Sequence, residues 1–220
     1  DKLAMMWVAN DKSDRKFTFS DMKRYSAKTA NYFESLGIKK GDTVMLVLKR
    51  HYQFWFCMLA FHKIGAIAIP ATNQLVEHDF TYRFKAARVK AIVCTADGEV
   101  STEAEKAANE FPGMVKVLVG GKKDGWNDFN VEMERFSTHY NRTENTPCGN
   151  DPMLMLFTSG TTAQSKAVML SQRNIATNIY DLQSVENINE KDVSIALLPF
   201  HHIFGSTCMA YTLACGVKIV

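Results

Sequence analysis

The amino-acid sequence predicts an α/β fold with mostly parallel β-sheets flanked by helices. Short apolar, β-branched runs alternate with longer segments of helical periodicity from residue 43 to residue 119. The strand-like runs are apolar along almost their whole length, as strands covered on both faces are. Glycine or proline follows several of these segments and marks where they end.

The composition is that of a compact globular protein. Of the 220 residues, 46% are hydrophobic, which is enough for a substantial core. The 26 basic and 23 acidic residues are interspersed and leave a net charge of +3, so we expect no nucleic-acid partner. The most apolar stretch, residues 54–70, is interrupted by His62, Lys63 and Gly65, so we expect no membrane span.

The cysteines and the first residues indicate a cellular compartment. The five cysteines form no CxxC pair, and most lie among apolar neighbours. No charged segment followed by an apolar one begins at Asp1, so no secretory signal is visible. Together these features predict a reduced, cytoplasmic protein.

The first half of the chain predicts a regular alternation of elements. After the strand-like residues 16–19, Ser20 is expected to cap a helix that runs to Leu36 and that Gly37 ends. The later elements are expected as strands at 43–48, 66–69, 91–95 and 115–119, and helices at 52–64, 76–87 and 102–109. The aromatic residues of the 52–64 helix are expected to be core.

The second half begins with a weaker pattern. Residues 120–151 are polar and contain several glycines, with one short helical candidate at 131–136. We therefore expect an N-terminal scaffold subdomain at 1–150 and a second α/β subdomain at 151–220. Its expected elements are a strand at 153–157, a polar loop, a helix at 172–185 capped by Ser171, a strand at 193–197, an apolar helix from about 204 to 216, and a strand at 217–220.

The loop after the 153–157 strand has a composition suited to polyphosphate. Residues 157–167 read Phe-Thr-Ser-Gly-Thr-Thr-Ala-Gln-Ser-Lys-Ala. Gly160 would let successive backbone N–H groups converge on an anion, and Lys166 would add a positive charge. The hydroxyl donors are those of Thr158, Ser159, Thr161 and Thr162. Composition alone would more often indicate a simple turn, and the GxxxxGK[ST] pattern of a Walker A loop is absent.

Two motifs resemble those of a known superfamily. Thr158-Ser159-Gly160-Thr161-Thr162, followed four residues later by Lys166, resembles the phosphate-binding signature of adenylate-forming enzymes. That superfamily comprises acyl-CoA synthetases, luciferases and peptide-synthetase adenylation domains. Residues 198–205, Leu-Pro-Phe-His-His-Ile-Phe-Gly, resemble its second core motif, whose histidine lies near the substrate carboxylate. His202 matches that position.

The resemblance also covers the beginning of the chain, and it has departures. Residues 41–44 and 65–70 resemble the opening βαβ segment of the superfamily and are interpreted as scaffold. Most members continue the phosphate loop with glycine, a variable residue, proline, lysine and glycine, whereas this chain has Ala-Gln-Ser-Lys-Ala at 163–167. An alanine in place of glycine matters only where φ is positive. Residues to about 119 look most like medium-chain acyl-CoA synthetases, and those from 157 look more like bacterial long-chain ones.

The resemblance implies an AMP-forming ligase that takes a small-molecule carboxylic acid, ATP with Mg²⁺, and coenzyme A. Thr158, Ser159, Gly160, Thr161, Thr162 and Lys166 would hold the phosphates of ATP. Thr158 would also serve as a ligand to the metal, Lys166 would steady the leaving pyrophosphate, and His202 would position the acid. Residues 151–220 would then begin an ATP-binding subdomain.

Other interpretations stay open at this point. The superfamily's later elements, including its magnesium-binding glutamate and its C-terminal lysine, have no counterpart in the chain, so we expect a fragment that is inactive alone. The fragment would then act as a phosphate-binding or structural module. Delivery of the acyl group to a carrier-protein thiol is another alternative. The sequence leaves the acid and the oligomeric state undetermined.

Overall fold

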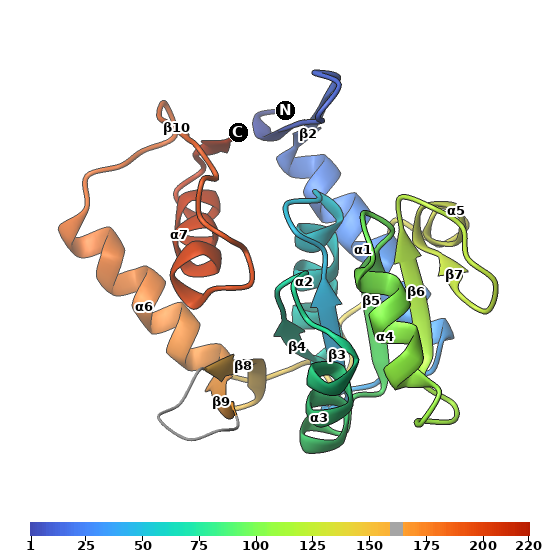
Figure 1. Cartoon of the computed structure of the whole chain (residues 1–220). Coiled ribbons are helices and arrows are strands. Elements are labelled where there is room, and N and C mark those ends of the chain that lie inside the picture. Colours follow the sequence, from blue (N-terminus) through green and yellow to red (C-terminus); the bar gives the residue numbers. More distant parts are fainter. Residues whose placement is uncertain (159–164) are drawn as a thin grey trace.

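Two β-sheets organise the chain in the computed structural model, which describes residues 1–158 and 165–220 (Figure 1). The larger sheet has seven strands in the order β7-β6-β5-β3-β4-β8-β9. Its strands are β3 (Thr43–Val47), β4 (Ile67–Pro70), β5 (Ala91–Thr95), β6 (Val115–Val119), β7 (Asn127–Asp128), β8 (Pro152–Thr158) and β9 (Lys166–Ser171). All neighbouring pairs are parallel except β8 and β9, which are antiparallel. The predicted α/β class is confirmed.

Helices cover both faces of this sheet (Figure 1). The helices are α1 (Phe19–Ser35), α2 (Gln53–Ile64), α3 (Glu77–Ala87), α4 (Val100–Ala108), α5 (Phe129–Met133), α6 (Gln172–Val185) and α7 (Ile203–Ala214). The side chains of β3 alternate between two buried clusters, one on each face of the sheet. Val44 and Leu46 belong to the cluster that α1, α2 and α5 cover. Met45 and Val47 belong to the cluster that α3 and α4 cover. Burial on both faces explains why residues 44–47 of the strand are all apolar.

A second sheet has four strands in the order β10-β11-β1-β2. Its strands are β1 (Leu3–Val8), β2 (Asp14–Thr18), β10 (Val193–Ser194) and β11 (Lys218–Ile219). β1 pairs in parallel with β11, where Met5 lies opposite Ile219, so this sheet joins the first and last parts of the sequence. The strand expected at 193–197 is therefore shorter than predicted and belongs to a different sheet from β8.

Several expected elements are confirmed. β5, β6 and α6 have the bounds that the sequence predicts, and Ser171 caps α6 by accepting a hydrogen bond from the backbone N–H of Asn174 at 3.2 Å. Gly65 ends α2 with a left-handed φ of 82°. The aromatic residues Phe54, Trp55 and Phe56 are buried in the core, as expected.

Other predictions were wrong. Thr18, not Ser20, caps α1: its hydroxyl accepts from the backbone N–H of Asp21 at 3.1 Å, and the Asp21 carboxylate accepts from the N–H of Thr18 at 2.9 Å. This reciprocal capping box outweighs a serine that the helix can accommodate inside its first turn. The strands β1, β7 and β9 were also not predicted from the sequence.

The predicted division at residue 150 stays a prediction. β8 follows that point in the sequence and pairs with β4, with Ala68 opposite Leu154, so the seven-stranded sheet continues across it. Within the described ranges, no helix has the length and apolar character that crossing a membrane requires.

Candidate functional site

The predicted phosphate loop connects the two antiparallel strands β8 and β9. Thr158 ends β8 and lies opposite Lys166, the first residue of β9. The Thr158 hydroxyl donates to the carbonyl oxygen of Lys166 at 3.5 Å. The structure therefore brings these two predicted site residues together at the base of a hairpin. The other four predicted phosphate ligands, Ser159, Gly160, Thr161 and Thr162, lie outside the described residues.

The base of the hairpin offers a positive charge and a hydroxyl group to solvent. Thr158 and Lys166 are both exposed. Within residues 1–158 and 165–220, no carboxylate lies within ion-pair distance of the Lys166 ammonium group. An exposed, unneutralised lysine beside a hydroxyl can attract and hydrogen-bond a polyphosphate without first breaking an ion pair.

The described residues of the candidate site can bind Mg²⁺ only together with the phosphates of a nucleotide. Among the described residues, no group of three or more His, Cys, Asp or Glu side chains could hold a metal ion. Mg²⁺ commonly keeps several waters and takes few ligands from the protein when it binds with substrate phosphates. The Thr158 hydroxyl can supply one oxygen ligand to such an ion. The metal would share the negative charge of the phosphates.

The alanine at position 167 causes no backbone strain. Ala167 lies in β9 opposite Phe157, and it is not among the described residues with a positive φ. The loss of glycine at this point of the superfamily pattern is therefore compatible with the strand. Ala163, the other departure from glycine, lies outside the described residues.

His202 is the N-cap residue of α7. Its Nδ1 accepts a hydrogen bond from the backbone N–H of Phe204 at 3.2 Å. Because Nδ1 accepts, the proton of the neutral ring is on Nε2, and the exposed side chain can donate that proton to an anion. The neighbouring His201 is half-buried, and burial, together with repulsion between the two rings when both are protonated, lowers the pKa of His201.

Phe200 fixes this second motif to the N-terminal helices. Its buried ring packs against the rings of Phe54 and Trp55 on α2, with centroids 5.1 Å and 5.4 Å away. The aromatic residues of α2, expected to be core, thus also determine where the chain runs just before His202. The contact links residues that are far apart in the sequence.

Gly205 lies in the second motif, and its role in packing was not predicted from the sequence. A Cβ at this position would lie closer than 3.0 Å to the carbonyl oxygen of Pro199. The first turn of α7 can therefore pack on the Pro199 backbone only when residue 205 is glycine. A glycine inside a predicted helix was the signal that could have revealed this close approach.

The hairpin and the cap of α7 are separate parts of the candidate site. Among the described residues, no hydrogen bond joins His202 to Thr158 or Lys166. Helix α6 lies between them in the chain and runs beside α7 (Figure 1). The Tyr211 hydroxyl of α7 donates to the carbonyl oxygen of Leu182 on α6 at 3.4 Å. The catalytic and binding assignments made from the sequence stay predictions.

Comparisons with known proteins identify relatives over most of the chain. The family model described as AMP-binding enzyme matches residues 1–220. The human mitochondrial acyl-coenzyme A synthetase ACSM5 is 34% identical over 174 residues, which is 77% of this chain and 29% of that protein. A crotonobetaine/carnitine–CoA ligase from Salmonella paratyphi B is 29% identical over 92% of this chain and 40% of its own length.

Solved structures share the fold. The anthranilate CoA ligase AuaEII, solved with anthranoyl-AMP, has a TM-score of 0.88 at 20% identity and is covered over 42% of its chain. ATP-bound MatB from Rhodopseudomonas palustris has a TM-score of 0.82 at 23% identity and is covered over 41%. The present chain spans less than half the length of each of these relatives. It belongs to the AMP-binding enzyme family.

Proposed function

We propose that this chain is part of an ATP-dependent acid–CoA ligase. In the first step, a carboxylate oxygen of the acid attacks the α-phosphorus of ATP, and the bond to pyrophosphate breaks. In the second step, the thiol sulfur of coenzyme A attacks the acyl carbon, the bond from that carbon to the AMP oxygen breaks, and the thiol proton is released. Both steps need stabilisation of phosphate charge more than acid–base chemistry.

The observation that carries this proposal is the hairpin base. Thr158 and Lys166 stand opposite each other and face solvent in a chain that matches the AMP-binding family model along its length. Lys166 would hold the β- and γ-phosphates and stabilise the charge that develops on pyrophosphate. The hydroxyl of Thr158 would bind a phosphate oxygen or Mg²⁺, which would neutralise part of that charge. Ser159, Gly160, Thr161 and Thr162 would complete the phosphate contacts.

His202 is proposed to position the carboxylate of the acid. Its Nδ1 is occupied by the Phe204 N–H, so Nε2–H is the atom left to meet a carboxylate oxygen. A neutral donor is sufficient for orientation, because a carboxylic acid is already ionised at neutral pH and needs no base to deprotonate it. The partner is a small-molecule carboxylic acid. A fatty acid is proposed because the acyl-coenzyme A synthetase is among the relatives, while the acyl length is left open.

A second candidate function follows from the length of the match. The chain spans 29% of the human acyl-coenzyme A synthetase and 42% of the anthranilate CoA ligase. The 220 residues by themselves would then bind a nucleotide without turnover. Transfer of the acyl group to a carrier-protein thiol is the alternative second step.

The test is ATP–pyrophosphate exchange with Mg²⁺ and carboxylic acids of increasing chain length. It is run on the 220-residue chain and on any longer natural protein that contains it. Acid-dependent exchange supports activation and reveals the preferred acid. Exchange by a longer protein alone supports the binding-module role for these residues. The absence of exchange from both, with no binding of Mg·ATP, would contradict the proposal.

The compartment is proposed to be the cytoplasm. Five free cysteines, two of them buried, are compatible with a reducing environment. One relative named above is mitochondrial, so mitochondria are the alternative. Fractionation of cells that express the natural protein, followed by detection with an antibody, distinguishes the two.

A further inference from the structure

Helix α3 contacts the hairpin on both sides of the predicted phosphate loop. The hydroxyl of Tyr82 donates to the carbonyl oxygen of Ser165 at 2.7 Å. Ser165 is the described residue that directly precedes Lys166. This hydrogen bond ties the beginning of β9 to a helix on one face of the large sheet.

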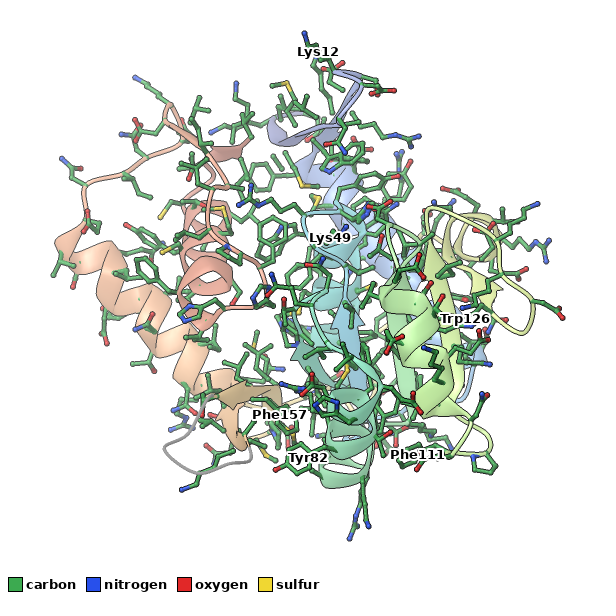
Figure 2. All side chains as sticks on the ribbon, in the orientation of Figure 1. Lys12, Lys49, Tyr82, Phe111, Trp126 and Phe157 are labelled. Carbon is green, nitrogen blue, oxygen red and sulfur yellow. The ribbon has the colours of Figure 1, made fainter. Side chains whose placement is uncertain are left out.

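The same helix contacts the end of β8. The ring of Tyr82 meets the ring of Phe157 edge-on, with centroids 6.1 Å apart (Figure 2). The guanidinium group of Arg83 lies 5.3 Å from the centre of the Phe157 ring. Phe157 directly precedes Thr158, so two adjacent residues of α3 hold the strand residues next to both described phosphate-ligand candidates.

Arg83 is itself fixed in place. Its side chain is only 12% exposed, and it pairs with the Asp79 carboxylate at 3.5 Å and donates to the Asp79 carbonyl oxygen at 3.3 Å. Burial lowers the pKa of Arg83 and the charge of Asp79 opposes this effect, while a guanidinium stays protonated at neutral pH. An arginine with these partners acts through the Phe157 ring and is poorly placed to bind a ligand itself.

β9 has few other contacts that fix its position. It is an edge strand of the seven-stranded sheet, and its first four residues are exposed. Little apolar burial therefore fixes the position of Lys166, and the pairing with β8 fixes it only relative to that strand. The hydrogen bond from Tyr82 to Ser165 restrains the start of β9, and the contacts of Tyr82 and Arg83 with Phe157 restrain the end of β8 against the same helix.

We infer that Tyr82 and Arg83 are positioning residues for nucleotide binding, because they hold Thr158 and Lys166 in the arrangement that meets the phosphates. The inference rests on the proposed function. Restraining the ligand residues before binding reduces the conformational entropy lost when ATP binds. Neither side chain needs to touch the nucleotide for this effect.

The deciding variant is Tyr82→Phe, which removes one hydroxyl and keeps the ring against Phe157. The matched control is Tyr180→Phe on α6, where the side chain is 73% exposed. We measure Mg·ATP affinity by calorimetry and, for a protein with exchange activity, KM and kcat for ATP separately. Tyr82→Phe is expected to weaken ATP binding by about three- to tenfold, the effect of losing one neutral hydrogen bond. The control is expected to match the wild type.

Hydrogen exchange measured by mass spectrometry provides the independent readout. Tyr82→Phe is expected to increase amide exchange in peptides from β8 and β9 and to leave β5 and β6 unchanged. A second variant, Arg83→Gln, keeps a planar polar group and is expected to affect β8 more than β9.

The outcomes separate the inference from the proposed function. If the wild type binds ATP, unchanged ATP affinity together with unchanged amide hydrogen exchange in Tyr82→Phe would overturn the positioning role. A wild type that neither binds Mg·ATP nor exchanges pyrophosphate would overturn the proposed function and with it the nucleotide role of Tyr82. A uniform increase of amide exchange over the whole chain would indicate general destabilisation and would also contradict the inference.

Discussion

The backbone N–H of Phe204 donates to Nδ1 of His202 across 3.2 Å, so the side chain proposed to meet the substrate also caps α7. The two roles can be separated by substitution. Asparagine caps helices well but has no imidazole, whereas alanine has neither a capping group nor an imidazole.

Both His202→Asn and His202→Ala are therefore expected to reduce acid-dependent pyrophosphate exchange by about tenfold, because alanine has no donor and the shorter asparagine amide does not place an N–H where the imidazole has Nε2–H. Only His202→Ala is expected to lower the free energy of unfolding, by about 1 kcal/mol. Urea denaturation and exchange kinetics of both variants provide the check. Wild-type exchange in the asparagine variant would exclude a role for the imidazole.

Gly205→Ala is expected to displace the first turn of α7 from Pro199. The added Cβ would meet the Pro199 carbonyl oxygen closer than 3.0 Å, and backbone atoms cannot yield as a flexible side chain can. We expect a loss of roughly 1–3 kcal/mol in unfolding free energy, typical of overpacking. Gly149→Ala is the control and should change stability little, because an added Cβ there would meet only the Arg173 side chain, at 3.4 Å or more. Calorimetric melting of both variants, with exchange activity for Gly205→Ala, tests this prediction.

Lys166→Met is expected to reduce pyrophosphate exchange by about a hundredfold, the usual effect of losing one preorganised electrostatic contact to a developing charge. Methionine keeps the apolar stem, so stability should change little at an exposed strand position. Lys191→Met, at another exposed lysine, is the control. Equal kinetics for the two variants would remove Lys166 from the proposed mechanism.

His62 is expected to make the fold sensitive to mild acid. Its Nε2 is buried without a hydrogen-bond partner among the described residues, and burial lowers the pKa of His62 from 6.5 to about 4. The folded state therefore binds a proton on His62 less readily than the unfolded state does. The contribution of the neutral ring to the free energy of unfolding is complete above pH 6.5 and is lost as the pH falls towards 4. Over that interval the free energy of unfolding should fall by roughly 2–3 kcal/mol through this group.

The measurement is urea denaturation at several pH values between 7 and 4, using wild type, His62→Gln and His78→Gln. The His62 variant should lose most of the pH dependence. His78 has a side chain that is 84% exposed, so its variant should behave like the wild type. The same acid sensitivity in all three proteins would show that His62 does not cause it.

Much of the large sheet could be predicted because its strands and helices carry their own signals. The apolar run of β5 and the serine cap of α6 are local features, and both were placed correctly. β9 was missed because its first four side chains are exposed and its strand conformation depends on pairing with β8. β1 was missed for a similar reason, since its partners β2 and β11 include a strand from the far end of the sequence.

Only part of the candidate site could likewise be predicted from the sequence. The motif around Lys166 and the position of His202 can be found from residue type and order. The contact of Tyr82 with Ser165 and the approach of Gly205 to Pro199 cannot, because both depend on how separate segments pack. A glycine in a predicted helix gave a hint of the second contact, and nothing in the sequence distinguishes Tyr82 from other helical tyrosines.

The central claim is that a carboxylate attacks the α-phosphorus of ATP. It is tested most directly by supplying a carboxylic acid labelled with ¹⁸O in both carboxylate oxygens, together with Mg·ATP and coenzyme A, to a longer natural protein that contains this chain. Mass spectrometry of the products should find one ¹⁸O atom in AMP, since the bond between the acyl carbon and that oxygen breaks when the thiol attacks. Unlabelled AMP, or ADP and phosphate as products, would contradict the account.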